Sequence, residues 1–122
     1  MTKLVFKGEP LSTNHVWKHS CRNGYLHSYM TPAGAALKEA YEWQAKAQWK
    51  QAILLGDVEL EVTLYFGNRR KRDPDNQLKL LFDSMNRIVY ADDSCITKFT
   101  VYKAYDKAHP RVEVSVAETI GK

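Results

Sequence analysis

The sequence predicts an α/β (α+β) fold, with a single mixed β-sheet, two helices and an N-terminal β-hairpin. Three observations support this fold class. Residues 58–66 alternate between apolar and polar side chains, as a strand with one buried face does. Residues 32–54 and 74–89 instead repeat their apolar side chains at helical spacing. No linker or internal repeat interrupts these segments, so we expect one domain that covers residues 1–122.

The N-terminal region predicts a strand followed by a hairpin. Residues 2–7 form a β-type run that ends at Gly8. Further along, Asn23-Gly24 separates two runs of aromatic and β-type residues, and this pair is typical of a two-residue hairpin turn.

The hairpin segment also has a composition that suits nucleic acid. Asn14 and Lys18 lie near Trp17 and Tyr25 in the sequence. Such side chains can contact phosphates and stack on bases. The alternative is an ordinary surface hairpin with aromatic side chains packed inward, and the sequence leaves both interpretations open.

A first helix is expected from Thr31-Pro32 to about Leu54. Thr31 is a suitable N-cap, and Pro32 suits the first helical position. Trp43 and Trp49 fall within this segment, and core packing or a subunit contact accounts for them better than ligand binding does. The apolar stripe expected to face the core is Ala36, Leu37, Ala40, Tyr41, Ala47 and Leu54.

The strand at residues 58–66 leads directly to four consecutive cations and then to a second helix. Asp73 is expected to cap this helix, with Pro74 at its first position and Asp75 in its first turn. Its polar side carries Asn76, Lys79, Asp83 and Arg87, and Lys79 lies four residues after Asp75. The expected buried face consists of Leu78, Leu81, Phe82, Met85 and Val89.

The C-terminal region contains two further β-type runs. Residues 95–104 and 111–116 are separated by the turn segment 106–110. Because the turn is short, we expect these two strands to form an antiparallel hairpin.

Charge and composition narrow the class of protein. The chain carries 18 basic and 14 acidic residues, a net charge of +4, and the run at 69–72 concentrates the excess. Cys21 and Cys95 lack metal-ligand spacing and are expected to be reduced thiols. No run of 18 or more apolar residues and no signal peptide are found. We therefore expect a cytoplasmic protein with no membrane partner and no small-molecule cofactor.

The junction of the basic run with the acids predicts a metal-dependent phosphodiesterase site. Cations attract phosphate, whereas Asp73, Asp75 and the later pair Asp92-Asp93 would repel it. Two carboxylates ~4 Å apart repel by about 4 kcal/mol at an effective dielectric constant near 20. A hard divalent cation between the acids and the phosphate would relieve this repulsion. Without the ion, at least one acid should bind a proton more readily than a free aspartate does.

These motifs together resemble the RusA family of Holliday-junction resolvases. The resemblance covers nearly the whole chain and includes the basic run and the Phe82-Asp83 pair. It also includes the Ser12-Thr13-Asn14 segment, the D-x-D-N-x-x-K core formed by Asp73, Asp75, Asn76 and Lys79, and the Asp92-Asp93-Ser94 ending.

The resemblance implies specific roles for four residues. Asp73, Asp75 and Asp93 match the essential acids of the family, and Lys79 matches its essential lysine. It further implies a homodimer that uses Mg²⁺ or Mn²⁺ to nick two strands of a four-way DNA junction symmetrically, during recombination and repair. Arg87 departs from the family pattern, because a glycine often ends the helix there. The gap from the helix to Asp92 is also slightly shorter than in some members, and these departures leave the choice between Asp92 and Asp93 open.

Several other polar residues are expected to bind DNA. We expect phosphate or base contacts from Asn14, Lys18, Arg69, Arg70, Lys71, Arg72 and Asn76. Each motif residue has a plain structural alternative as a cap, ion pair, turn or solvated loop. Two other functions are consistent with parts of this pattern: a non-catalytic nucleic-acid-binding module and a D-x-D nucleotide-sugar transferase. The second is disfavoured because the chain is short and no nucleotide-binding unit is evident.

Overall fold

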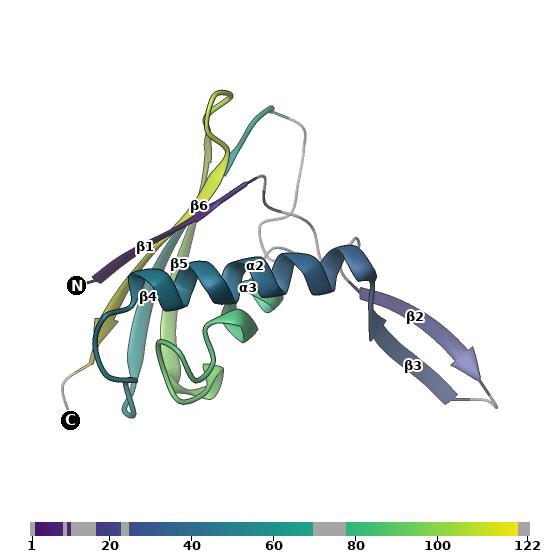
Figure 1. Cartoon of the computed structure of the whole chain (residues 1–122), viewed down its shortest axis with the longest axis horizontal. Coiled ribbons are helices and arrows are strands. Elements are labelled where there is room, and N and C mark those ends of the chain that lie inside the picture. Colours follow the sequence, from purple (N-terminus) through teal and green to yellow (C-terminus); the bar gives the residue numbers. More distant parts are fainter. Residues whose placement is uncertain (1, 9, 11–16, 23–24, 70–77, 120–122) are drawn as a thin grey trace.

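The computed structural model describes residues 2–8, 10, 17–22, 25–69 and 78–119, with the backbone alone for the strands between residues 17 and 30. None of the helices in this described part is long and apolar enough to cross a membrane. The elements in chain order (Figure 1) are β1 (Thr2–Lys7), β2 (Trp17–Arg22), β3 (Tyr25–Met30), α2 (Pro32–Gln48), β4 (Val58–Phe66), α3 (Leu78–Ser84), the 3-10 helix η2 (Asp93–Cys95), β5 (Ile96–Tyr105) and β6 (Arg111–Glu118).

Four strands form one mixed sheet in the order β1-β6-β4-β5. β6 is antiparallel to both of its neighbours, and β5 runs parallel to β4. The predicted single mixed sheet is therefore confirmed.

The N-terminal hairpin is a separate two-stranded unit. β2 and β3 pair antiparallel, with Arg22 opposite Tyr25. This register leaves a two-residue connection between the strands, as predicted, although Asn23 and Gly24 themselves lie outside the described residues. Figure 1 shows the hairpin projecting from the N-terminal end of α2, away from the sheet.

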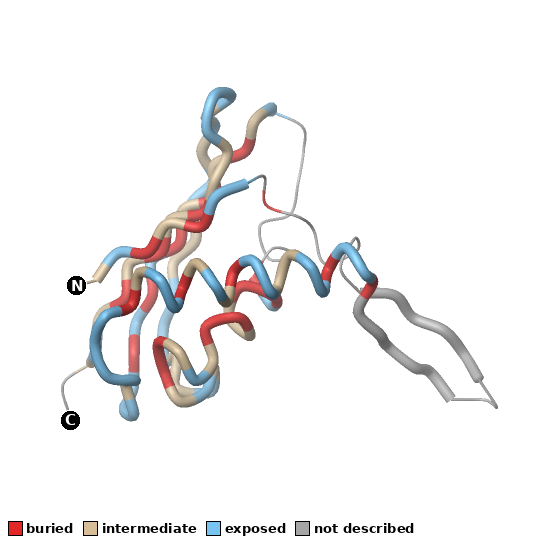
Figure 2. Tube along the Cα trace, viewed as in Figure 1, coloured by how far each residue is buried: buried red, intermediate tan, exposed pale blue. Residues whose placement is uncertain are grey.

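The core lies between one face of the sheet and the two helices. Every second side chain of β4 faces this core and is at most 2% exposed, which confirms the predicted alternation. Tyr41 of α2 contributes from the helix side, and its ring meets that of Phe6 edge-on, with centroids 5.1 Å apart. Figure 2 shows the buried positions recurring along the strands and along α2.

The predicted hairpin between the last two strands is wrong, because β4 lies between β5 and β6. The short connection instead passes over the end of β4, where the Asp106 N–H donates a hydrogen bond to the Phe66 carbonyl at 2.9 Å. Two strand spacings amount to only ~10 Å, so a short turn can cross one intervening strand. The central position gives β4, whose inner face is entirely apolar, a partner on each side.

The first helix begins as predicted but ends earlier. Thr31 Oγ1 accepts a hydrogen bond from the Gly34 N–H at 3.0 Å, which confirms the cap. The helix ends at Gln48 and not near Leu54, because Trp49 adopts an extended backbone, and its buried indole donates to the Ala52 carbonyl.

The apolar stripe expected on this helix is only partly buried. Tyr41 is buried and Leu37 and Leu54 are partly buried, but Ala36, Ala40 and Ala47 are exposed, which corrects the prediction. A methyl group gains little free energy from burial, so alanine positions indicate a helix face weakly. Trp49 packs in the core, whereas Trp43 is 65% exposed, with the Lys46 ammonium 5.5 Å from its ring centroid.

The second helix is also shorter than its apolar pattern. Leu78, Leu81, Met85 and Val89 are buried as predicted and Phe82 is half-buried, but Leu80 is buried as well. Val89 lies beyond the helix end, because the bonds from Met85 N to Phe82 O and from Asn86 N to Asp83 O have three-residue spacing and close the helix. Arg87 then adopts a left-handed conformation with φ 66°.

Candidate active site

The structure describes only some of the predicted site residues. Asn14, Arg70, Lys71, Arg72, Asp73, Asp75 and Asn76 lie outside the described residues, and Lys18 is described only as part of the β2 backbone. Lys79, Asp93 and Arg69 can be placed in full. The geometry of these three and of their neighbours therefore defines the candidate site.

Lys79 lies in α3 and faces away from the core. It is exposed between the buried residues Leu78 and Leu80. Asp83 follows four residues later, so the two side chains project from the same side of the helix. The amino-terminal half of α3 therefore presents a cation, and its carboxyl-terminal half presents an acid.

Asp93 is the first residue of η2 and lies against Asp83. The pKa of Asp93 is raised, first by partial burial and then by the negative charges of Asp92 and Asp83. Two acids from segments ten residues apart in the chain thus meet at one place. The predicted repulsion of Asp93 by Asp73 and Asp75 stays a prediction, because those two residues lie outside the described part of the chain.

Asp92 has a different role from Asp93. It is the N-cap of η2, and its side chain accepts a hydrogen bond from the Ser94 N–H at 3.0 Å. Hydrogen bonds from the Ser94 side chain and backbone lower the pKa of Asp92. The structure therefore distinguishes a capping acid, Asp92, from a crowded acid, Asp93.

Tyr90 is a buried residue close to these acids. Its side chain is fully buried, and its hydroxyl donates a hydrogen bond to the Phe82 carbonyl at 2.8 Å. Burial raises the pKa of Tyr90 well above its usual range, and the charges of Asp93, Asp83 and Asp92 raise it further. The neutral hydroxyl links the last turn of α3 to the segment that carries Asp93.

Backbone hydrogen bonds hold this segment in place. The Leu54 N–H donates to Val89 O at 2.9 Å, and the Ala91 N–H donates to Leu54 O at 3.0 Å. The Arg87 N–H donates to Tyr90 O at 2.7 Å, which closes the left-handed turn at Arg87. The acids are therefore placed by an ordered turn.

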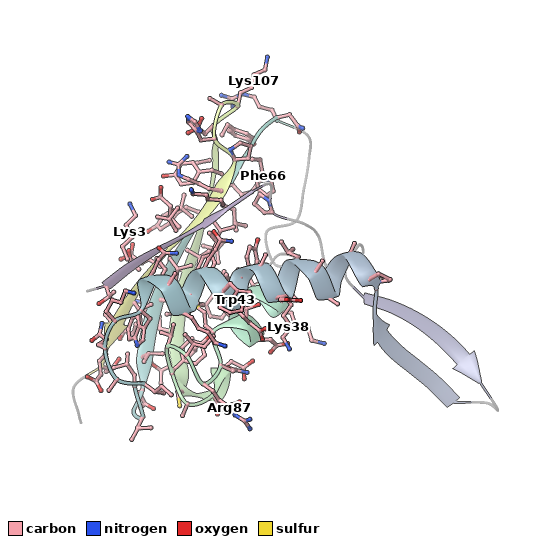
Figure 3. All side chains as sticks on the ribbon, viewed as in Figure 1. Lys3, Lys38, Trp43, Phe66, Arg87 and Lys107 are labelled. Atoms are coloured by element: carbon pink, nitrogen blue, oxygen red, sulfur yellow. The ribbon has the colours of Figure 1, made fainter. Side chains whose placement is uncertain are left out.

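A cavity of about 290 Å³ adjoins the acids. Asn86 contributes to its lining, and the side-chain oxygen of Asn86 is buried without a hydrogen-bond partner among the described residues. Figure 3 labels two of its lining residues, Lys38 on α2 and Arg87 at the lower edge of the view. Its lining combines both charges: Lys38, Glu42, Asp83, Asn86, Arg87 and Asp92.

Arg69 lies at the other end of the sheet. It is exposed just beyond β4, with its guanidinium carbon 4.3 Å from the centroid of the Tyr105 ring. Tyr105 pairs with Phe66 at the carboxyl end of β4, whereas Ile96, next to the acids, pairs with Val58 at its amino end. Eight residue steps of β4 correspond to roughly 26 Å. The structure thus does not place Arg69 beside Asp93.

Asp83 and Tyr90 are the site residues that sequence reasoning did not select. One signal was present for Asp83, because Asp75, Lys79 and Asp83 follow one another at intervals of four, the spacing of one helix face. No pattern marked Tyr90, since its contact with Phe82 depends on the turn after α3.

The acids have the chemistry of ligands for a hard cation. Carboxylate oxygens are the donors that Mg²⁺ prefers, and the crowding of Asp83 and Asp93 is what a cation would relieve. Within the described ranges, no group of three His, Cys, Asp or Glu side chains is placed to hold a metal ion. The predicted ligands Asp73 and Asp75 lie outside those ranges.

Comparison with known proteins finds a protein family and relatives of this chain. The family model of the endodeoxyribonuclease RusA matches residues 7–117. The uncharacterized protein YqaN of Bacillus subtilis (strain 168) is 27% identical over an alignment of 137 positions, which covers 95% of each chain. The crossover junction endodeoxyribonuclease RusA of Aquifex aeolicus (strain VF5) is 32% identical over 75 residues, which cover 61% of this chain and 60% of that protein.

Proposed function

Because this chain belongs to the RusA family of endodeoxyribonucleases, we propose that it is a Mg²⁺-dependent resolvase of four-way DNA junctions. It would cut as a homodimer, making paired symmetric nicks in the course of recombination and repair in a bacterial or phage-infected cytoplasm. The name of the Aquifex aeolicus relative, a crossover junction endodeoxyribonuclease, supports the substrate class.

The observation that carries this proposal is the pairing of Asp93 with Asp83 over the buried hydroxyl of Tyr90. A partly buried acid with a raised pKa is unfavourable for stability alone, because burial and like charge both oppose its ionisation. Perturbed acids of this kind are enriched at functional sites. Asp93 is also the acid that the family resemblance selects.

In this proposal the protein holds the metal-binding carboxylates, the Lys79 ammonium and the DNA in fixed positions. Asp73, Asp75 and Asp93 would hold Mg²⁺, or alternatively Mn²⁺, with the Asp83 carboxyl group close to Asp93. When bound, such an ion supplies charge to the scissile phosphate and lowers the pKa of a coordinated water. Lys79, exposed on the Asp83 side of α3, would stabilise negative charge that develops on the phosphate.

The basic residues would bind the phosphates that flank the cleavage point. Arg69 lies at the far end of the sheet from Asp93, so it would grip DNA away from the scissile bond and contribute affinity and register. We assign the same role to Arg70, Lys71, Arg72, Asn14, Lys18 and Asn76. A homodimer would supply the two active sites that paired nicks require.

The experiment compares four-way, flap and linear duplex DNA, each with Mg²⁺ and with chelator. We expect paired nicks confined to the four-way junction and only in the presence of the ion. Asp75→Asn should lower the cleavage rate by about 100-fold or more while junction binding is retained, because a ligand is lost but the basic surface remains. Near wild-type cleavage by this variant would refute the metal assignment. Salt-sensitive binding of wild type without any cleavage would instead favour the non-catalytic nucleic-acid-binding module.

A further inference from the structure

β5 presents aromatic rings to solvent along one edge of the sheet. It is an edge strand, paired with β4. Phe99 and Tyr105 pair with Leu60 and Phe66, so they lie on the sheet face that the helices cover. Even so, Phe99 is 47% and Tyr105 39% exposed, because β5 lies at the margin of that face.

Each ring already has one neighbour on the protein and keeps further surface exposed. Phe82 of α3 meets Phe99 edge-on, with centroids 5.2 Å apart. The Arg69 guanidinium lies 4.3 Å from the Tyr105 centroid. Such neighbours hold a ring in a fixed orientation, as is required of a stacking platform.

The charge of the strand indicates the class of partner. Lys103 pairs with Leu64 and so lies on the same face as Phe99 and Tyr105, whereas Lys98 pairs with Glu59 on the opposite face. Arg69 extends the positive charge at the Tyr105 end. Aromatic and cationic side chains on one face suit a strand of nucleic acid, whose bases stack and whose phosphates are neutralised.

The strip is continuous with the candidate active site. Phe82, which contacts Phe99, precedes Asp83, and Asp83 meets Asp93 close to where β5 begins. Phe99 and Tyr105 are six residues apart, which corresponds to ~20 Å along a strand. In Figure 3, Phe66 and Lys107 mark the Tyr105 end of the sheet and Arg87 marks the end near the acids.

We propose that Phe99, Tyr105 and Arg69 form a binding track for an unpaired DNA strand that leads away from the catalytic acids. The choice of DNA as the nucleic acid rests on the proposed function, whereas the stacking itself rests on the strip alone. Unpaired bases expose the faces that the two rings can stack on, which paired bases within a duplex do not.

The test measures binding of the full-length chain to fluorescein-labelled oligothymidine by fluorescence anisotropy, in the presence of chelator so that no cleavage occurs. Phe99→Leu and Tyr105→Leu keep an apolar side chain and remove the ring. Each should weaken binding about tenfold, within the range found for loss of base–aromatic stacking. Tyr105→Trp should retain wild-type affinity, and circular dichroism verifies that each variant is folded.

Tyr102→Leu is the matched control. Tyr102 lies on the same strand and is 51% exposed, but it pairs with Thr63 and so lies on the opposite face. Its replacement should leave the affinity within about twofold of wild type, since no stacking platform is lost. Equal affinities of Phe99→Leu, Tyr105→Leu and Tyr102→Leu would overturn the proposal, as would a change in sedimentation mass of the Phe99 or Tyr105 variants with unchanged binding.

Cleavage assays separate this proposal from the proposed function. The binding track alone would be overturned if wild type cuts four-way junctions and the Tyr105→Leu variant binds oligothymidine as tightly as wild type does. The binding track would be supported and the resolvase function refuted if loss of the Phe99 or Tyr105 ring weakens oligothymidine binding but wild type cuts no branched DNA with Mg²⁺.

Discussion

The side-chain amide of Gln48 hydrogen-bonds both backbone groups of Val5. The Val5 N–H donates to Gln48 Oε1 at 2.8 Å, and Gln48 Nε2 donates to the Val5 carbonyl at 2.7 Å. Gln44 Oε1 accepts the Lys7 N–H in the same way at 2.8 Å. Because β1 is an edge strand, these glutamines of α2 occupy the positions that a further strand would otherwise take.

Gln48→Leu should destabilise the protein by about 1 to 3 kcal/mol, because both partly buried backbone groups of Val5 lose their partner. Urea unfolding measures the loss, and sedimentation should reveal association through the uncovered edge of β1. Gln51→Leu is the control, since Gln51 makes only an exposed bond to Thr2 Oγ1, and it should cost less than about 0.5 kcal/mol. Equal losses in the two variants would contradict the edge-protection role.

Arg87→Gly should stabilise the protein by about 0.5 to 1 kcal/mol. Arg87 has φ 66°, a conformation that glycine adopts without the steric cost that other L-residues incur. The greater freedom of glycine in the unfolded chain offsets part of this gain. Thermal unfolding measures the change, and Arg87→Ala is the control because it removes the same side chain but retains the strained φ. A gain in the alanine variant equal to that in the glycine variant would show that charge, and not backbone strain, is responsible.

Stability should fall as the pH drops below about 4. Hydrogen bonds from Arg111 and from the His109 N–H lower the pKa of Asp106, and those from Lys3 and then Arg111 lower the pKa of Glu113. A lowered folded-state pKa adds stability above the unfolded values, about 3.9 for Asp and 4.3 for Glu, and this is lost as pH falls through the folded values. Melting temperatures between pH 3 and 7 measure the effect. Arg111→Met should flatten the profile, and an unchanged slope would refute the ion-pair explanation.

Asp93 and Asp92 should differ in their effect on cleavage. Asp93→Asn should lower the rate about 100-fold or more, because Asp93 is the crowded acid proposed to hold the ion. Asp92→Ser should keep most of the activity, since serine also caps the turn that begins at Asp92. Junction cleavage by both variants provides the measurement, and greater loss in the Asp92 variant would reverse the assignment.

Removal of Mg²⁺ should affect the stability of wild type and not that of Asp93→Asn. A ligand that binds only the folded protein raises its melting temperature, so Mg²⁺ should stabilise wild type. Burial and like charge raise the pKa of Asp93, which means that its ionised form destabilises the metal-free fold above the unfolded pKa. Metal-free Asp93→Asn should therefore melt above metal-free wild type at pH 7. A Mg²⁺-dependent gain of equal size in both proteins would contradict a role for Asp93 in metal binding.

Local patterns in the sequence were enough to predict most elements. The alternation in β4, the Thr31 cap and the Asn23-Gly24 hairpin signal each depend on residues a few positions apart, and the strands and the cap that they predicted are present. The D-x-D-N-x-x-K motif and the basic run pointed to the family in the same way, and the family match confirms it.

Only the tertiary structure decided which elements are neighbours. It placed β4 between β5 and β6, brought Asp83 to Asp93, separated Arg69 from both, and left Phe99 and Tyr105 exposed at an edge. The spacing of apolar residues indicates which face of a helix or strand is buried. The choice of partner depends instead on how distant surfaces fill space together, and no short stretch of sequence contains that information.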